Sequence, residues 1–190
     1  MWLLGHLGIG YQIAKPVTNR LPKVFVLLGT LLPDLIDKPL YYALVFFTGK
    51  TSRELGLISC TRTIAHTAIF LFFLLVIAWL KKSKIFAALS VGVATHLLLD
   101  SVQDYYFNHF IEDLSLSKGD PSSSLMALVF PYFGQFAEMP FDSIQDHLKS
   151  GSRSFTLLGE VIGFILLGYH YWKFKVWRNR PLWKKPKVGQ

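Results

Sequence analysis

The chain is poor in cysteine. Cys60 is the single cysteine among 190 residues, so an intrachain disulfide is excluded and the redox compartment stays undetermined. We interpret Cys60 as a small packing residue, with a thiol nucleophile as the alternative. Internal repeats and low-complexity stretches are also missing. The length therefore predicts one compact domain.

Charged residues are scarce, and the C-terminal end lacks acids altogether. They make up 17% of the chain, whereas soluble domains usually carry about 25%. This scarcity, with hydrophobic residues at 52%, favours a membrane protein. Residues 173–190 hold seven of the basic residues and no acid. A basic run directly after an apolar segment predicts a cytoplasmic tail that contacts anionic lipid, and nucleic-acid binding is the less favoured interpretation.

The apolar segments predict an all-α fold, namely a polytopic membrane helical bundle with about five short membrane segments. These segments cover residues 1–14, 22–36, 63–80, 85–102 and 155–172. The first of them lacks the basic start and the cleavage site of a signal peptide. Residues 39–48 are too short to cross and are expected to lie on the surface or to re-enter. We expect residues 1–172 to form one membrane-embedded domain and residues 173–190 a basic tail.

The basic residues predict how these segments are oriented. Lys15, Arg20 and Lys23 follow the first segment, and a lysine cluster at residues 81–84 follows the third. By the positive-inside rule, these residues and the tail are cytoplasmic. The N-terminus and the connection over residues 103–150 are then expected outside.

Histidine and aspartate recur inside this apolar sequence. The candidates are His6, Asp34, Asp37, His66, His96 and Asp100. Ionisable groups at membrane depth are costly and therefore suggest a functional site. Imidazole and carboxylate together are the usual ligands of a zinc-class ion. The predicted orientation puts all six near the outer leaflet, although their positions played no part in deriving it.

The spacing of these residues supports a shared site. His96 and Asp100 are four apart and project from one helix face. Asp34 and Asp37 share a face if their segment stays helical, although Pro33 predicts a break or a new helix start there. Helix capping by the aspartates and hydrogen bonding by single histidines are the alternatives. The remaining histidines lack the pattern. We interpret His170 as an interface anchor, and His109 and His147 as solvated loop residues.

The order of these motifs carries a family resemblance. His6, Pro33-Asp34-x-x-Asp37, Arg62-x-x-x-His66-Thr67 and His96-x-x-x-Asp100 resemble the membrane-bound metal-dependent hydrolase family that includes a LexA-regulated inner-membrane protein. The similarity runs to about Phe141 and includes an aromatic-proline element at residues 128–134. Thr61 is a departure, because many members place a histidine there. The order also resembles, more distantly, the zinc-dependent phospholipase C fold. The resemblance implies a hydrolase of the prokaryotic inner membrane without naming its substrate.

The predicted chemistry is metal-assisted hydrolysis. The six residues offer more ligands than one zinc-class ion usually takes. Either one ion is bound and the spare carboxylates lie around its ligands, or two ions share a bridging carboxylate. A coordinated water is activated, and whichever of Asp34 and Asp37 is spare accepts its proton. Arg62 either neutralises a phosphoryl oxygen or snorkels at the interface. The expected partners are membrane lipids and a lipid-like ester or phosphoester. A metal-binding or ion-translocating protein without hydrolytic activity, and an envelope protein braced by a structural metal, are the alternatives.

Overall fold

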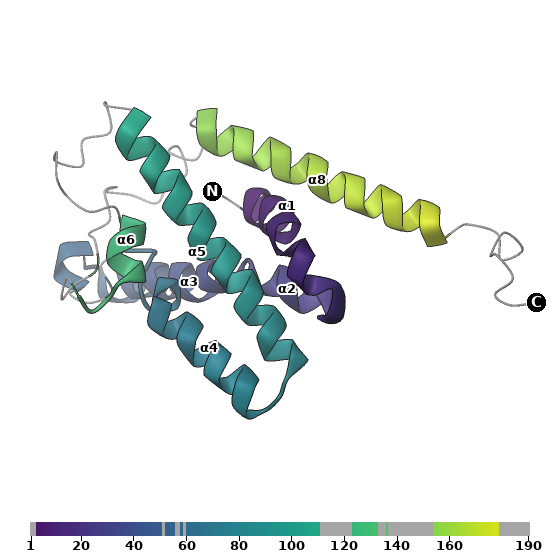
Figure 1. Cartoon of the computed structure of the whole chain (residues 1–190). Helices are drawn as coiled ribbons and strands as arrows, with labels where there is room; N and C mark the ends of the chain where they lie inside the picture. Colours follow the sequence, from purple (N-terminus) through teal and green to yellow (C-terminus); the bar gives the residue numbers. More distant parts are fainter. Residues whose placement is uncertain are drawn as a thin grey trace, which may run out of the picture.

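The computed structural model describes residues 3–50, 52–55, 58, 60–110, 123–132, 136 and 154–178. These residues form helices and no strand, which confirms the all-α prediction. The central helix α5, Lys84–Phe110, packs against α1, α2, α3, α4 and α6, whereas α8 packs along α1 (Figure 1). The other helices are α1 (Leu3–Ala14), α2 (Lys23–Gly29), α3 (Leu32–Thr48), α4 (Ala68–Leu80), α6 (Ser123–Leu128) and α8 (Ser154–Arg178), with short 3-10 helices η1 (Lys15–Arg20), η2 (Ser52–Leu55) and η3 (Ile64–His66).

The chain turns between α2 and α3, within the range predicted as one segment. Pro33 lies in the first turn of α3, where a missing backbone N–H costs nothing, and the new helix start suggested at this proline is confirmed. The helix then continues through Pro39 and ends where Gly49 adopts a left-handed φ of 65°. Residues 39–48 are thus the second half of α3, and their surface-lying or re-entrant placement in a membrane stays a prediction.

The predicted helix over residues 63–80 begins late, at Ala68. Thr67 caps its first turn, because its hydroxyl oxygen accepts a hydrogen bond from the Phe70 N–H at 3.0 Å. The preceding residues form turns and η3. The four-residue spacing of Arg62 and His66 therefore does not correspond to one α-helical turn. α5, in contrast, runs beyond residue 102 to Phe110.

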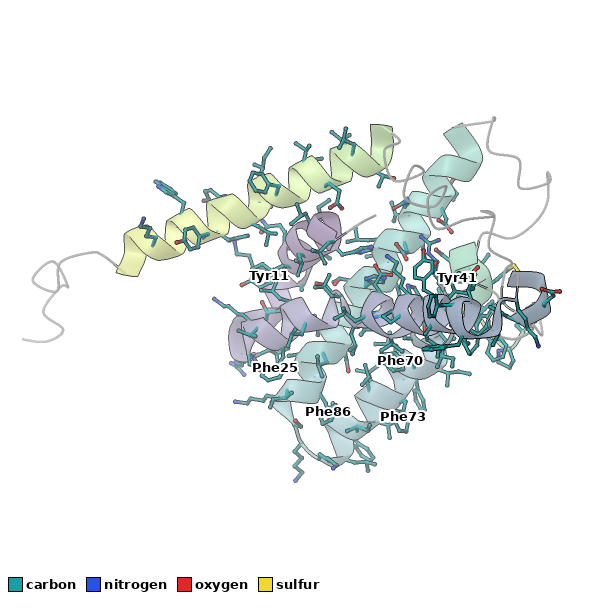
Figure 2. The ribbon with its side chains drawn as sticks, turned by 180° about the vertical axis from the view of Figure 1, so that it is seen from behind. Tyr11, Phe25, Tyr41, Phe70, Phe73 and Phe86 are labelled. Carbon is teal, nitrogen blue, oxygen red and sulfur yellow. The ribbon has the colours of Figure 1, made fainter. Side chains whose placement is uncertain are left out.

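Among the described helices, Lys84–Tyr105 is the one long and apolar enough to cross a membrane, and Ala68–Leu80 is a shorter apolar helix. The five predicted spans are therefore not all borne out by length. Many large apolar side chains are nevertheless exposed on α3, α4 and α8. Phe46 and Phe47 are each 82% exposed, and Phe73 on α4 is another exposed example (Figure 2). Apolar surface of this extent is typical of contact with a membrane or a partner.

Glycines and a part-buried polar contact hold α8 against α1. A Cβ added to Gly8 would lie 2.2 Å from the Gly163 carbonyl oxygen, so only glycine permits this approach. The Glu160 carboxylate accepts hydrogen bonds from the backbone N–H groups of Leu4, at 2.9 Å, and Gly5, at 3.0 Å. These groups have no partner within α1, so Glu160 caps the helix that carries His6.

Candidate metal centre

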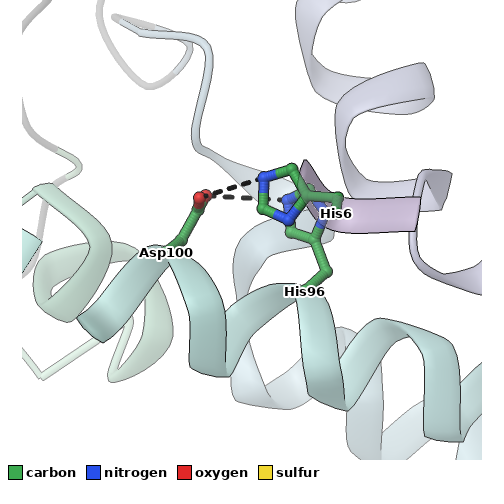
Figure 3. A group of neighbouring side chains, drawn as sticks. All are labelled: His6, His96 and Asp100. Atoms are coloured by element: carbon green, nitrogen blue, oxygen red, sulfur yellow. Dashed lines mark ion pairs between the residues drawn. The ribbon is translucent and has the colours of Figure 1, made fainter. Parts of the chain in front are cut away.

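The structure brings together all six histidines and aspartates that the sequence singled out. They come from four elements: His6 from α1, Asp34 and Asp37 from α3, His66 from η3, and His96 and Asp100 from α5. Two groups of three have potential ligand atoms within 4.8 Å of one another. One group is His6, His96 and Asp100 (Figure 3), and the other is Asp34, His66 and His96.

Asp37 holds His66 in place. Its carboxylate is fully buried and lies 2.7 Å from His66 Nδ1. It also accepts hydrogen bonds from the backbone N–H groups of Thr63 and Ala65, which fixes the segment before α4. Both oxygens of the Asp37 carboxylate therefore accept hydrogen bonds. Because Nδ1 donates to Asp37, His66 presents Nε2 to the centre, as metal-ligating histidines commonly do.

His96 is oriented in the same way by a carbonyl group. Its Nδ1 lies 2.8 Å from the Thr30 carbonyl oxygen, which can only accept, so Nδ1 carries the proton. A neutral His96 therefore presents an unprotonated Nε2. That atom lies 3.2 Å from Nε2 of His66. Two lone pairs facing each other at this distance repel, unless a proton or a cation lies between them.

The carboxylates of Asp34 and Asp100 flank this pair of nitrogens. Asp34 Oδ1 lies 3.6 Å from His66 Nε2 and 3.9 Å from His96 Nε2. Asp100 Oδ2 lies 3.7 Å and 3.6 Å from the same two atoms. The Asp34 side chain is 17% exposed, whereas those of Asp100 and both histidines are at most 4% exposed. Among these four side chains, that of Asp34 is therefore the most accessible.

His6 contacts the other oxygen of the Asp100 carboxylate. Its Nε2 lies 3.3 Å from Asp100 Oδ1, and its ring stacks on His96 with centroids 3.9 Å apart (Figure 3). The two oxygens of Asp100 therefore face different partners. Oδ1 faces His6, and Oδ2 faces the two Nε2 atoms.

Arg62 is bound to carboxylates. Its Nε lies 3.2 Å from Asp100 Oδ2, and its Nη1 lies 2.9 Å and 3.0 Å from the two oxygens of Asp104. Nη1 also donates to the hydroxyl of Ser124 at 2.8 Å. Burial alone would lower the pKa of Arg62, but Asp100 and Asp104 raise it, so the guanidinium stays charged. In this arrangement Arg62 anchors Asp100.

Asp104 and Ser124 were missed by the sequence analysis. Asp104 had a detectable signal, because it lies four residues after Asp100 and so continues the face of α5 that carries His96. Ser124 had none, since it lies 62 positions from Arg62 and in no motif. Its backbone N–H also donates to Asp104 at 3.0 Å, which ties α6 to the centre.

The contacting charges around the centre do not balance. Asp34, Asp37, Asp100 and Asp104 contribute four negative charges, and Lys38 and Arg62 two positive ones. With neutral histidines, this described set carries a charge of −2. Buried charge of one sign is costly unless it is compensated. One divalent cation would neutralise this set.

The other predicted residues lie apart from the centre. The Cys60 thiol is buried against Ala127 and Phe136, and burial raises its pKa to about 11, as expected for a packing residue. His170 lies 2.8 Å from the side-chain oxygen of Gln12. His109 is part of α5, so its placement in a loop was wrong, and His147 lies outside the described residues.

Comparison with protein families gives a match over more than half of the chain. Residues 1–111 match the model of a family described as YdjM inner membrane protein. This range contains all six residues of the centre, together with Arg62 and Asp104. The aromatic-proline element at residues 128–134 lies beyond it. Comparison with curated proteins and with solved structures gives no match.

Proposed function

This chain belongs to the YdjM inner membrane protein family, and in that setting we propose that it is a metal-dependent hydrolase of a lipid-like ester or phosphoester. The observation that carries the proposal is the 3.2 Å separation of His66 Nε2 and His96 Nε2, with both Nδ1 atoms engaged elsewhere. Zinc bonds of about 2.0–2.1 Å in a tetrahedron separate two ligand nitrogens by about 3.3–3.4 Å. The charge of −2 supports the same conclusion.

His66, His96 and Asp34 are the residues that would hold the ion. Nε2 of each histidine and Oδ1 of Asp34 form one of the two convergent groups. Three protein ligands with a further open position are typical of catalytic zinc sites, whereas structural sites are closed by four. The exposure of Asp34 supports access to that position from outside the protein.

The arrangement favours one ion over two. His96 belongs to both convergent groups, yet the Thr30 carbonyl engages its Nδ1. Its remaining lone pair, on Nε2, can bind one ion at a time. A second ion beside His6 and Asp100 would then have two protein ligands among the described residues, fewer than zinc sites use.

We propose Asp100, which the sequence predicted as a ligand, as the general base. A zinc-class ion, when bound, lowers the pKa of a coordinated water to about 7. Asp100 Oδ2 is nearly equidistant from the two histidine nitrogens, and His6 and Arg62 hold the carboxylate there. Asp100 accepts a proton as the water oxygen bonds to the carbonyl carbon or phosphorus. It then returns the proton to the leaving oxygen as the ester bond breaks.

The membrane arrangement belongs to the same proposal. We place the N-terminus outside and the tail at residues 173–190 in the cytoplasm, with residues 1–172 as one domain of about five membrane segments. The proximity of Lys15, Lys23 and Lys173 to His170 supports this, since basic residues from the start of η1, the start of α2 and the C-terminal part of α8 gather around one histidine.

Zinc content tests the proposal. Purified wild type and a His170→Ala control should each hold about one zinc ion per chain, and His96→Ala should hold far less. Wild type with zinc should release products from phospholipid vesicles, and chelation should stop the release. Equal zinc in His96→Ala and wild type would remove His96 as a ligand. A protein with zinc that moves ions across vesicles without hydrolysis would instead support the ion-translocating alternative.

A further inference from the structure

The accessible edge of the centre carries a second cation. Lys38 lies one turn after Asp34 on α3, and its side chain is 35% exposed. Its ammonium group contacts Asp34 Oδ2, while Asp34 Oδ1 faces the two histidines. One carboxylate therefore links the ammonium group to the centre, at the side that is open.

Arg62 and Lys38 differ in what surrounds them. Arg62 is held by two carboxylates and the Ser124 hydroxyl, and its side chain is 20% exposed. Lys38 has one described ion-pair partner, and that partner is a proposed ligand of the ion. Once Asp34 shares its charge with a dication, its attraction for Lys38 weakens. The ammonium group can then bind an anion that approaches the open position.

We propose that Lys38 and the open edge at Asp34 form a binding site for a phosphate anion, so that the substrate is a phosphoester. This inference rests on the proposed function. A carboxylic ester is neutral, so an ammonium group attracts it less strongly than it attracts an anion. A phosphate oxygen, in contrast, forms a charge-assisted hydrogen bond with lysine.

Neighbouring side chains on α3 suit a phosphate attached to an apolar tail. Leu35, Tyr42 and Phe46 are spaced so that they lie along the same stripe of the helix as Lys38. Leu35 is 56% exposed and Phe46 is 82% exposed. A phospholipid headgroup at Lys38 would place its acyl chains over these apolar side chains. Inorganic phosphate carries the same anionic group as a phospholipid headgroup but has no acyl chains. A comparison of the two ligands therefore shows which of them the site binds.

Cobalt-loaded protein in neutral detergent provides the test, because the visible spectrum of the ion reports ligands at the open position. Inorganic phosphate is titrated into wild type, Lys38→Met, Lys38→Arg and the control Lys81→Met, which alters an exposed lysine in the turn between α4 and α5. We expect equal cobalt content in all four. The dissociation constant for phosphate should rise about tenfold or more in Lys38→Met and much less in Lys38→Arg and Lys81→Met.

Lipid additions identify the source of the anion. Phosphatidylglycerol vesicles should change the wild-type spectrum and leave Lys38→Met nearly unchanged, whereas monoolein, which has no phosphate, should change neither. A response to inorganic phosphate but not to the vesicles would support the anion site and assign it to free phosphate. Equal phosphate affinity in wild type and Lys38→Met would overturn the inference while the metal site stands. Wild type that binds no cobalt would overturn the proposed function and this inference with it.

Discussion

At the scale of single residues, two aspartates three positions apart have different environments. Asp37 is fully buried and bonded to His66 and to two backbone N–H groups. Asp34 is partly exposed, faces both histidines and pairs with Lys38. The sequence predicted that the two would differ but not which of them would bind metal. Their neighbours in sequence are alike, and the difference arises from the packing of α3 against η3.

Asparagine substitutions should therefore have unlike effects. Asp37→Asn places an amide N–H₂ among hydrogen-bond donors, so it should destabilise the fold by about 1–3 kcal/mol. By loosening His66, it should also weaken zinc binding about 10–100-fold. Asp34→Asn should lose zinc while the metal-free protein unfolds at the wild-type temperature. Thermal unfolding with and without chelator, alongside zinc analysis, measures both effects. Identical behaviour of the two variants would argue against these roles.

Asp100 has a test of its own, because it was predicted as a ligand and is proposed here as the base. Asp100→Asn should keep about one zinc ion per chain and lower the rate of hydrolysis by ~10²–10⁴. Initial rates on phospholipid vesicles, normalised to zinc content, measure this change. Loss of zinc in the variant would instead make Asp100 a fourth ligand, and a closed site of that kind favours a structural role for the metal.

At the scale of helices, hydropathy predicted where most of them lie but not where they begin. The apolar run from residue 63 has the composition of a helix, yet residues 63–67 are not α-helical. The carboxylate of Asp37, 26 positions before Thr63, binds the backbone there instead. A local pattern holds no information about so distant an acceptor. The split of residues 22–48 into α2 and α3 was predicted only in part. Pro33 indicated a new helix start, but the sequence did not show that α3 continues through Pro39.

Two glycines of α8 provide a matched test of its contact with α1. A Cβ at Gly163 would lie 2.1 Å from the Leu4 carbonyl oxygen, whereas Gly168 on the same helix has nothing within 4 Å. Gly163→Ala should push the helices apart and destabilise the protein by about 1–3 kcal/mol. Gly168→Ala should be neutral or stabilise it by up to about 1 kcal/mol. Unfolding temperatures in one detergent compare the two. A Gly163→Ala protein as stable as Gly168→Ala would contradict this packing.

At the scale of the whole molecule, composition predicted a helical membrane protein, and the family match agrees. The spacing of six polar residues also predicted a shared site, and the structure brings those residues together. Spacing could not predict the anchoring of Arg62, because its partners come from α5 and α6 through tertiary packing. It also could not reveal the role of Glu160, which caps a helix more than 150 positions away.

The orientation in the membrane determines which leaflet the proposed site faces. His6 lies near the start of α1, and Lys15 follows the end of that helix. If the basic end is cytoplasmic, the centre lies toward the outer side. Reporters fused after Gln190 and inserted at Ser123 should therefore indicate the cytoplasm and the outside, respectively. Exchanging Lys81, Lys82 and Lys84 for glutamine should weaken this preference. Reporters that indicate the same side would make the orientation wrong, and the assignment of the site to outer-leaflet headgroups would fail with it.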